Sequence, residues 1–324
     1  MQYPLDRRLA IAPMMDRTDR HYRYFMRLIS RRVLLYTEML TTGAILHGDR
    51  ERLLGYSDIE HPLALQLGGS EPEQLADCAR IAEDRGYDEV NLNIGCPSDR
   101  VQSARFGACL MAEPDLVADC IARMRGQVKI PVTVKTRIGI DHRDSYGELE
   151  EFVRTVSAAG CDTFIIHARK AWLQGLSPKE NRDVPPLQYE IVYHLKRDFP
   201  GLNIVINGGF STMEQVLAQY DRVDGVMIAR AAYHDPYLLA GADSLVFKDQ
   251  ATPPTRREVL TGFIAYTRRN LEPGVSPRYM ARHIIGLYQG QAGARAFRRL
   301  ISEKVCRSPS GVDLLEQAIA GMPT

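Results

Sequence analysis

The chain has 324 residues, of which 45% are hydrophobic and 25% are charged, and its formal net charge is +1 at pH 7. No run approaches the roughly 20 apolar residues that a membrane span needs, and the first residues lack the apolar core of a signal peptide. We therefore expect a cytoplasmic protein without membrane contact. The length is enough for one large domain or two ordinary ones.

Eight short apolar runs recur between residues 9 and 229. They span 9–14, 34–39, 63–67, 89–94, 132–135, 163–167, 203–207 and 225–229. Segments with a helical pattern lie between most of them, at 71–85, 113–127, 146–159, 186–199 and 212–219. Such alternation indicates parallel β/α units, and eight units favour a (β/α)₈ TIM barrel. The alternative, a doubly wound sheet, would carry G-x-G-x-x-G after its first strand, and that motif is absent.

Beyond residue 237 the strand pattern stops. Residues 251–254 read as a linker, and helical patterns follow at 255–270, 277–289, 292–302 and 311–320. We predict a TIM-barrel domain at 1–244 and a small all-helical domain at 245–324. The helical part holds 12 Lys and Arg against 6 Asp and Glu. This positive balance favours a polyanionic partner, although a helical bundle with solvated basic faces would have the same composition.

Polar and reactive residues gather where the eight runs end, which is where a barrel keeps its chemistry. In chain order these ends carry Pro13-Met14-Met15, Glu38, Gln66, Asn93 with Cys96, Lys135 with Arg137, His167, Asn207-Gly208-Gly209, and Ala229-Arg230. Because unpaired buried polar groups cost free energy, core packing alone does not explain this set.

Six cysteines stand at positions 78, 96, 109, 120, 161 and 306, and we expect free thiols in a reducing compartment. No second His or carboxylate stands at metal-ligand spacing, so we predict no metal site. Cys96 is distinctive because Pro97 keeps it out of helical geometry at the tip of a strand. A structural turn is the ordinary role of such a residue. The two asparagines before it, Asn91 and Asn93, share one face and favour reactive chemistry, either nucleophilic or acidic.

Two further features favour a bound flavin. Gly208-Gly209 and Arg230 lie in the loops after the seventh and eighth strands, where this fold often binds phosphate. Lys135 lies in an otherwise apolar strand, where it suits the edge of a flavin that gains negative charge on reduction. A structural ion pair is the alternative for this lysine. Together with Gln66 and His167, these residues indicate FMN.

Several motifs together resemble the tRNA-dihydrouridine synthases. They are Ala-Pro-Met-Met at 12–15, Gln-Leu-Gly-Gly at 66–69, Asn-Leu-Asn-Ile-Gly-Cys-Pro-Ser at 91–98, Val-Lys-Thr-Arg-Ile-Gly at 134–139, His-Ala-Arg-Lys at 167–170 and Asn-Gly-Gly at 207–209. The segments at 173–182 and 230–237 are similar to the A-type subfamily.

The resemblance implies an FMN-binding barrel with a helical tRNA-binding domain, and no protein partner is evident from the sequence. The implied reaction is NAD(P)H-dependent reduction of the C5–C6 bond of uridines 20 and 20a in the tRNA D-loop, with NADPH as the expected reductant. Cys96 would be the proton donor, and Asn93 would contact the uridine. The implied FMN residues are Pro13, Met14, Met15, Gln66, Lys135, His167, Asn207, Gly208, Gly209, Ala229 and Arg230. The expected tRNA contacts are Lys179, Arg182, Arg298 and Arg299.

The sequence departs from the family pattern at two positions. Ala229 stands where the family usually has Gly, and Arg17 stands where an aromatic residue is common. Two other functions are weighed against the implied one. A dihydroorotate or dihydropyrimidine dehydrogenase would use a similar barrel on free pyrimidines, and a catalytically silent tRNA-binding chaperone would keep the basic helical part.

Overall fold

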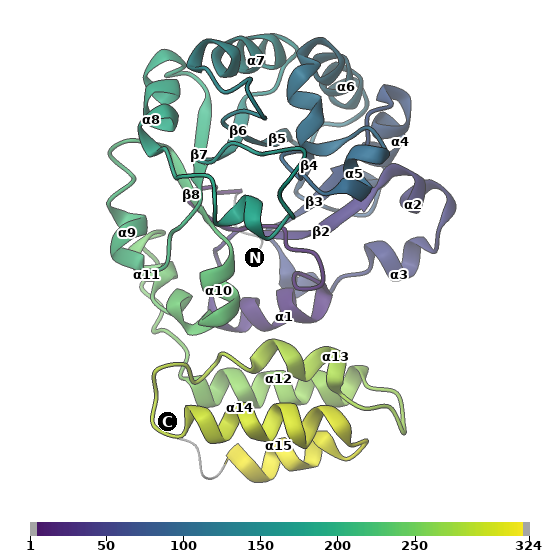
Figure 1. Cartoon of the computed structure of the whole chain (residues 1–324). Helices are drawn as coiled ribbons and strands as arrows, with labels where there is room; N and C mark the ends of the chain where they lie inside the picture. Colours follow the sequence, from purple (N-terminus) through teal and green to yellow (C-terminus); the bar gives the residue numbers. More distant parts are fainter. Residues whose placement is uncertain (1–4, 320–324) are drawn as a thin grey trace.

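A closed ring of eight parallel strands forms the centre of the computed structural model, which describes residues 5–319 (Figure 1). The strands are β1 (Leu9–Ile11), β2 (Leu35–Thr41), β3 (Leu63–Gly68), β4 (Glu89–Ile94), β5 (Val132–Arg137), β6 (Thr163–His167), β7 (Asn203–Asn207) and β8 (Gly225–Ile228). From β2 to β8 each strand pairs with the next in chain order, β8 pairs with β1, and a single bridge from Ala10 to Leu34 links β1 to the start of β2. The ring closes beside β2, where the Leu34 N–H donates to the Leu9 carbonyl at 3.1 Å. The predicted TIM barrel is confirmed.

Helices surround this ring on the outside (Figure 1). The α-helices of the barrel are α1 (Arg20–Ile29), α2 (Thr42–His47), α3 (Arg50–Leu54), α4 (Pro72–Asp84), α5 (Asp99–Ser103), α6 (Pro114–Gln127), α7 (Tyr146–Ala158), α8 (Tyr189–Asp198), α9 (Met213–Leu217), α10 (Arg230–His234) and α11 (Ala242–Leu245). The segments expected from the sequence did not include α1, although Tyr22, Phe25, Met26 and Ile29 recur at helical spacing; the helix also buries two arginines, Arg23 and Arg27. Among residues 5–319, no helix has the length and apolarity to cross a membrane.

The two-residue period of the strands divides the core into an outer and an inner part. On β4, Val90, Leu92 and Ile94 are buried in the large core that the strands share with the helices. Glu89, Asn91 and Asn93 therefore point into the barrel. The apolar core inside the barrel is small and contains Ala10, Ala12, Leu34, Tyr36, Ala64, Ile165, Val205 and Met227.

The C-terminal helices lie against α1, below the barrel in Figure 1. They are α12 (Arg256–Asn270), α13 (Arg278–Ala281), α14 (Ala294–Glu303) and α15 (Gly311–Ile319). Tyr24 of α1 stacks on Tyr266 of α12 with ring centroids 3.8 Å apart. The predicted single helix at 277–289 is wrong, because α13 ends in a 3₁₀ turn and the chain then packs tightly on the barrel. A Cβ atom on Gly286 would lie only 2.4 Å from the His234 carbonyl oxygen.

Asp19 joins the helical part to the barrel. Its Oδ1 caps α1 by accepting the N–H groups of His21 and Tyr22, each at 3.0 Å. Its Oδ2 accepts from Arg282 Nη2 at 2.7 Å and lies 3.0 Å from His283 Nε2. Burial alone raises the pKa of Asp19, but hydrogen bonds and charge from His283, with the bonds from Tyr22 and Arg282, outweigh it and hold that pKa well below its ordinary value.

We predict that Asp19→Asn lowers the free energy of unfolding at pH 7 by about 2 kcal/mol, because the cap survives while the charged bonds to Arg282 and His283 weaken. A carboxylate with a depressed pKa stabilises the fold above its unfolded pKa and loses that contribution as the pH falls toward the folded value. The difference between wild type and variant in urea unfolding should therefore be constant above about pH 4 and should shrink progressively as the pH falls below that value. An equal difference at every pH would contradict this account. Asp84→Asn, which removes an exposed pair with Arg80, is the control and should change little.

Candidate active site

Cys96 lies on a turn at the carboxyl end of β4, and Asn93 holds that turn. The Asn93 Oδ1 accepts the N–H groups of Gly95 and Cys96, each at 3.0 Å. The Cys96 carbonyl accepts the Ala108 N–H at 2.9 Å, which fixes the far side of the turn. The thiol is partly exposed, and its sulfur lies 3.6 Å from Ser98 Oγ. The structure therefore holds Cys96 on a rigid turn at the carboxyl ends of the barrel strands, an end that we call the mouth.

Lys135 is a partly buried cation without an Asp or Glu beside it in residues 5–319. Its Nζ donates to Asn207 Oδ1 at 3.1 Å, and it forms no ion pair with an Asp or Glu in residues 5–319. Burial and the nearby charge of Arg137 lower the pKa of Lys135 to about 7. The structural ion pair considered for this lysine is therefore not what holds it. A site of this kind attracts an anionic ligand, which would restore the lost solvation.

His167 and the two glycines of the β7 loop lie against one another. Burial, together with the positive charges of Arg137 and Lys135, holds the pKa of His167 well below its ordinary value, so the ring is neutral. Gly208 and Gly209 have φ angles of 127° and 78°, which favour glycine. A Cβ atom on Gly208 would lie 3.0 Å from His167 Cδ2, and one on Gly209 would lie 2.6 Å from Leu187 Cδ1. Backbone conformation and close packing both require these glycines.

Arg230 follows Ala229 at the start of α10, at the end of β8. Its Nη1 donates to Asp183 Oδ1 at 2.7 Å, and both side chains are about half exposed. Arg230 is therefore tied to the loop after β6 while it keeps a solvent-facing surface. The Arg182 side chain on the same loop is exposed, and partial desolvation of its guanidinium group together with the charge of Arg230 lowers its pKa.

A long loop, residues 168–188, is fastened over the end of β5 by Arg137, which the sequence analysis named only as a polar strand-end residue, and by Asn181, to which it gave no role. The Arg137 Nη1 donates to the carbonyls of Lys170 and Asn181, and its Nε donates to the Gly95 carbonyl at 2.9 Å. The fully buried Asn181 side chain bonds both the N–H and the carbonyl of Trp172. Arg137 thus joins the Cys96 turn to this loop. Its position two residues after Lys135 is what placed it among the polar strand-end residues in the sequence, although its contacts with the loop could not be foreseen there.

The remaining predicted residues divide between the mouth and the surface. Gln66 is buried on β3, and its Oε1 accepts from Asn93 Nδ2 at 2.9 Å. Met14 and Met15 follow β1, and the Met15 side chain is 56% exposed. Pro13 is partly exposed beside them, and Lys179 is exposed on the loop at 168–188. Arg298 and Arg299 lie on α14, away from this group, where Arg299 pairs with Glu303 at 2.9 Å.

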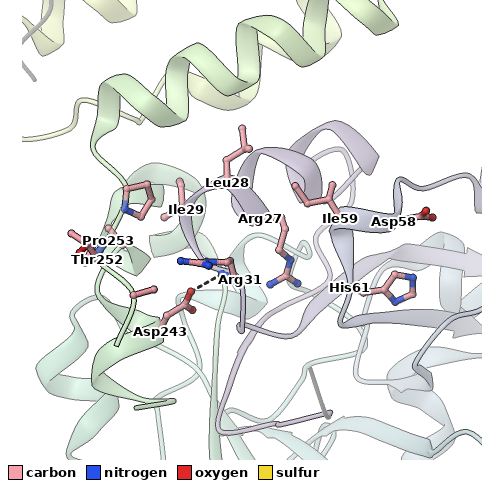
Figure 2. A pocket seen from close by; sticks show the side chains of 13 residues that line it. Arg27, Leu28, Ile29, Arg31, Asp58, Ile59, His61, Asp243, Thr252 and Pro253 are labelled. Atoms are coloured by element: carbon pink, nitrogen blue, oxygen red, sulfur yellow. Dashed lines mark hydrogen bonds between the residues drawn. The ribbon is translucent and has the colours of Figure 1, made fainter. Parts of the chain in front are cut away.

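A separate cavity of about 680 Å³ lies at the opposite, amino end of the barrel (Figure 2). The end of α1, the 3₁₀ turn before β3 and the linker at 251–254 line it, and Asp243 bonds the Arg31 N–H at its edge. None of the predicted site residues lines this cavity. In the described part of the chain, no three His, Cys, Asp or Glu side chains cluster in a way that could hold a metal ion.

Comparison with known proteins identifies close relatives over the whole length. A sequence model described as "Dihydrouridine synthase (Dus)" matches residues 10–320. The tRNA-dihydrouridine(20/20a) synthase of Shewanella oneidensis is 57% identical over 320 residues, covering 99% of this chain and 95% of that protein. The synthase of the same name from Pseudomonas aeruginosa is 56% identical, covering 97% of this chain and 95% of that protein.

Solved structures with a similar fold have little sequence identity. A 2-naphthoyl-CoA reductase complex superposes with a TM-score of 0.56 at 13% identity, covering 72% of this chain and 49% of that one. An old yellow enzyme homologue from Zymomonas mobilis superposes with a TM-score of 0.54 at 14% identity, covering 78% and 92%. These similarities support the barrel fold alone.

We predict that Lys135→Met stabilises the flavin-free protein while it weakens flavin binding. The expected gain is about 2 kcal/mol, because the substitution removes a buried unpaired charge and keeps the volume. A lysine whose folded pKa is depressed to about 7 destabilises the fold fully below that pH. The difference between variant and wild type should therefore shrink as the pH rises from 7 toward 10. Urea unfolding of flavin-free protein at pH 6 and pH 9 measures it, and a wild type that is more stable than the variant at pH 6 would contradict the assignment.

Proposed function

Because the chain belongs to the dihydrouridine synthase family, we propose that it reduces uridines 20 and 20a in the tRNA D-loop to 5,6-dihydrouridine, using FMN and NADPH. The observation that carries this proposal is the full-length similarity to synthases of that name, joined to a cysteine held at the mouth of the barrel. The reaction adds two hydrogens across the uracil C5–C6 bond and oxidises NADPH. We place it in the cytoplasm, where tRNA is available.

The residues of the mouth fit FMN by their chemistry. Lys135 supplies a partly buried cation that lacks an anion, and the neutral ring of His167 and the side-chain amides of Gln66 and Asn207 supply polar contacts around it. Arg230 and the glycine loop would hold the phosphate. When bound, FMN supplies hydride chemistry at its N5 position. The residues proposed to hold it are Pro13, Met14, Met15, Gln66, Lys135, His167, Asn207, Gly208, Gly209, Ala229 and Arg230.

Cys96 is the proposed proton donor. A hydride reaches C6 of the uracil from one face, and the thiol at Sγ protonates C5 from the other as a general acid. Asn93 uses its oxygen to anchor the Cys96 turn and one amide hydrogen to bond Gln66, so only its second amide hydrogen is available for a uracil carbonyl. The target uridine leaves its stack in the tRNA to reach the mouth, as enzymes that act on bases require.

The tRNA is proposed to cross the mouth and the helical part. Lys179 and Arg182 are exposed on the loop at 168–188, which Arg137 fastens beside the Cys96 turn. Arg298 and Arg299 present positive charge on α14 and would contact the phosphates of the elbow. The decisive test of the whole proposal is the dihydrouridine map of tRNA from cells that lack this protein. Loss at positions 20 and 20a alone is expected, and an unchanged map would refute it.

We predict that Cys96→Ala retains FMN and its reduction by NADPH but slows dihydrouridine formation by on the order of 100-fold or more, because it removes the general acid. Single-turnover reduction of tRNA by the pre-reduced enzyme measures this effect. Cys109→Ala is the matched control. Cys109 lies in the next loop, where its thiol donates to the Phe106 carbonyl, and its loss should leave the rate near that of wild type. Wild-type turnover by the Cys96 variant would remove this residue from the mechanism.

We predict that the double variant Arg298→Glu, Arg299→Glu raises KM for tRNA and lowers the salt dependence of binding by about 2 in slope, because two phosphate contacts are lost. NADPH oxidation by the enzyme without tRNA should not change. Arg80→Glu, Arg123→Glu is the matched control, because these arginines are also exposed but lie on α4 and α6. An equal effect of both pairs would indicate a general charge effect and exclude Arg298 and Arg299 as contacts.

A further inference from the structure

A continuous chain of hydrogen bonds runs down the inside of the barrel from the Cys96 turn. The Asn93 Nδ2 donates to Gln66 Oε1, and the Gln66 Nε2 donates to Asn91 Oδ1, each at 2.9 Å. The Asn91 Nδ2 donates to Thr133 Oγ1 at 2.9 Å, and the Thr133 hydroxyl donates to Glu89 Oε1 at 2.7 Å. Every bond in this relay points the same way, from the mouth toward the carboxylate of Glu89.

Glu89 fixes that direction because its carboxylate can only accept. It is fully buried at the amino end of β4 and is paired with Arg7, whose Nε lies 2.7 Å from Oε2. Burial and the charge of Glu89 hold the pKa of Tyr36 well above its ordinary value, so the Tyr36 hydroxyl stays protonated and donates to Oε1 at 2.6 Å. Thr133 must therefore give its single proton to Glu89 and accept from Asn91.

The donor role of Asn91 toward Thr133 in turn fixes the orientation of each side-chain amide between Thr133 and the mouth. An amide can be turned end for end at almost no steric cost, so only its hydrogen bonds decide which end is the oxygen. Since Asn91 must donate downward to Thr133, it presents its oxygen to Gln66. Gln66 then presents its own oxygen to Asn93, whose oxygen is left to face the N–H groups of Gly95 and Cys96. A reversed Asn93 would set its NH₂ group against those two N–H groups.

We infer that Glu89, Thr133 and Asn91 are positioning residues for Cys96, and that they act by fixing the orientation of the Asn93 amide. The inference rests on the proposed function only in taking Cys96 as the proton donor. None of the three needs to touch the flavin or the uridine. Each acts through the bonds below the mouth, and the carboxylate that orients them all lies at the opposite end of β4.

Core filling alone does not account for this relay. Elsewhere inside the barrel, Ala10, Ile165, Val205 and Met227 fill the space with apolar side chains, which cost no desolvation. The buried polar groups of the relay lie on β3, β4 and β5, beside the strand that carries Cys96. A fully connected network in a place of low polarity is rigid, because each unmade bond would leave a buried polar group unpaired.

The test compares two substitutions at one position. Thr133→Val keeps the shape and removes the hydroxyl, whereas Thr133→Ser keeps the hydroxyl and removes a methyl group. Thr136→Val is the control, because Thr136 lies on β5 but faces the helices and makes only weak bonds of 3.4 Å. The first readout is the alkylation rate of Cys96 in flavin-loaded protein, followed by mass spectrometry of its peptide. The second is the single-turnover reduction of tRNA, compared with flavin reduction by NADPH.

We expect Thr133→Val to change Cys96 alkylation several-fold and to slow tRNA reduction roughly tenfold, since a small misplacement of a reacting group costs that much. Flavin reduction should not change, and Thr133→Ser and Thr136→Val should behave as wild type. Equal behaviour of the Val and Ser variants in both readouts would overturn the inference. Alkylation needs no RNA, so a wild type that fails to make dihydrouridine would contradict the proposed function without touching this result.

If Thr133→Val does not hold flavin, Asn91→Asp gives the same information. The substitution keeps the size of the side chain, but an ionised carboxylate cannot donate to Thr133. A protonated one can, so the ratio of variant to wild-type alkylation should move toward one as the pH is lowered. A ratio that is independent of pH would contradict the role of the relay.

Discussion

The register between β4 and β5 is the constraint on which the whole mouth depends. In this register Asn91 of β4 lies opposite Thr133 of β5, and Asn93 lies opposite Lys135. A slip of one residue would turn every inward side chain of a strand toward the helices, because the side-chain period is two. The apolar residues at Val90, Leu92 and Ile94 prevent that slip by filling the outer core. The same packing that stabilises the barrel therefore sets the positions of its polar groups.

The positively charged groups at the carboxyl end of the barrel lack anionic partners in the protein alone. Burial lowers the pKa of Lys135 to about 7 and that of Arg137 to about 10, and it keeps His167 neutral. These groups are costly in the free fold and favourable beside an anion. The residues at the ends of β5 and β6 therefore lower the stability of the ligand-free protein while they favour binding of an anion. Such a trade-off between stability and function is common at functional sites.

Strand periodicity and the residues at strand ends were sufficient to predict the barrel and to bring Gln66, Lys135, His167 and Asn207 to one end of it. They were insufficient where contacts between distant residues determine the local structure. The burial of Arg23 and Arg27 in α1 depends on partners at Glu60, far along the chain, and the segment at 277–289 bends to place Gly286 against the barrel. The role of Asn181 depends on contacts made across a long loop, and no local pattern contains them.

Asp19 gives the molecule a thermodynamic property that neither of its parts has separately. One oxygen of its carboxylate caps the helix that follows residues 13–18, and the other is bonded by Arg282 of the helical part. Any ligand that shifts one of these attachments changes the free energy of the other. If RNA bound to the helical part altered the bond between Asp19 and Arg282, a ligand held by residues 13–18 would alter the affinity for RNA by the same factor, because such coupling is reciprocal.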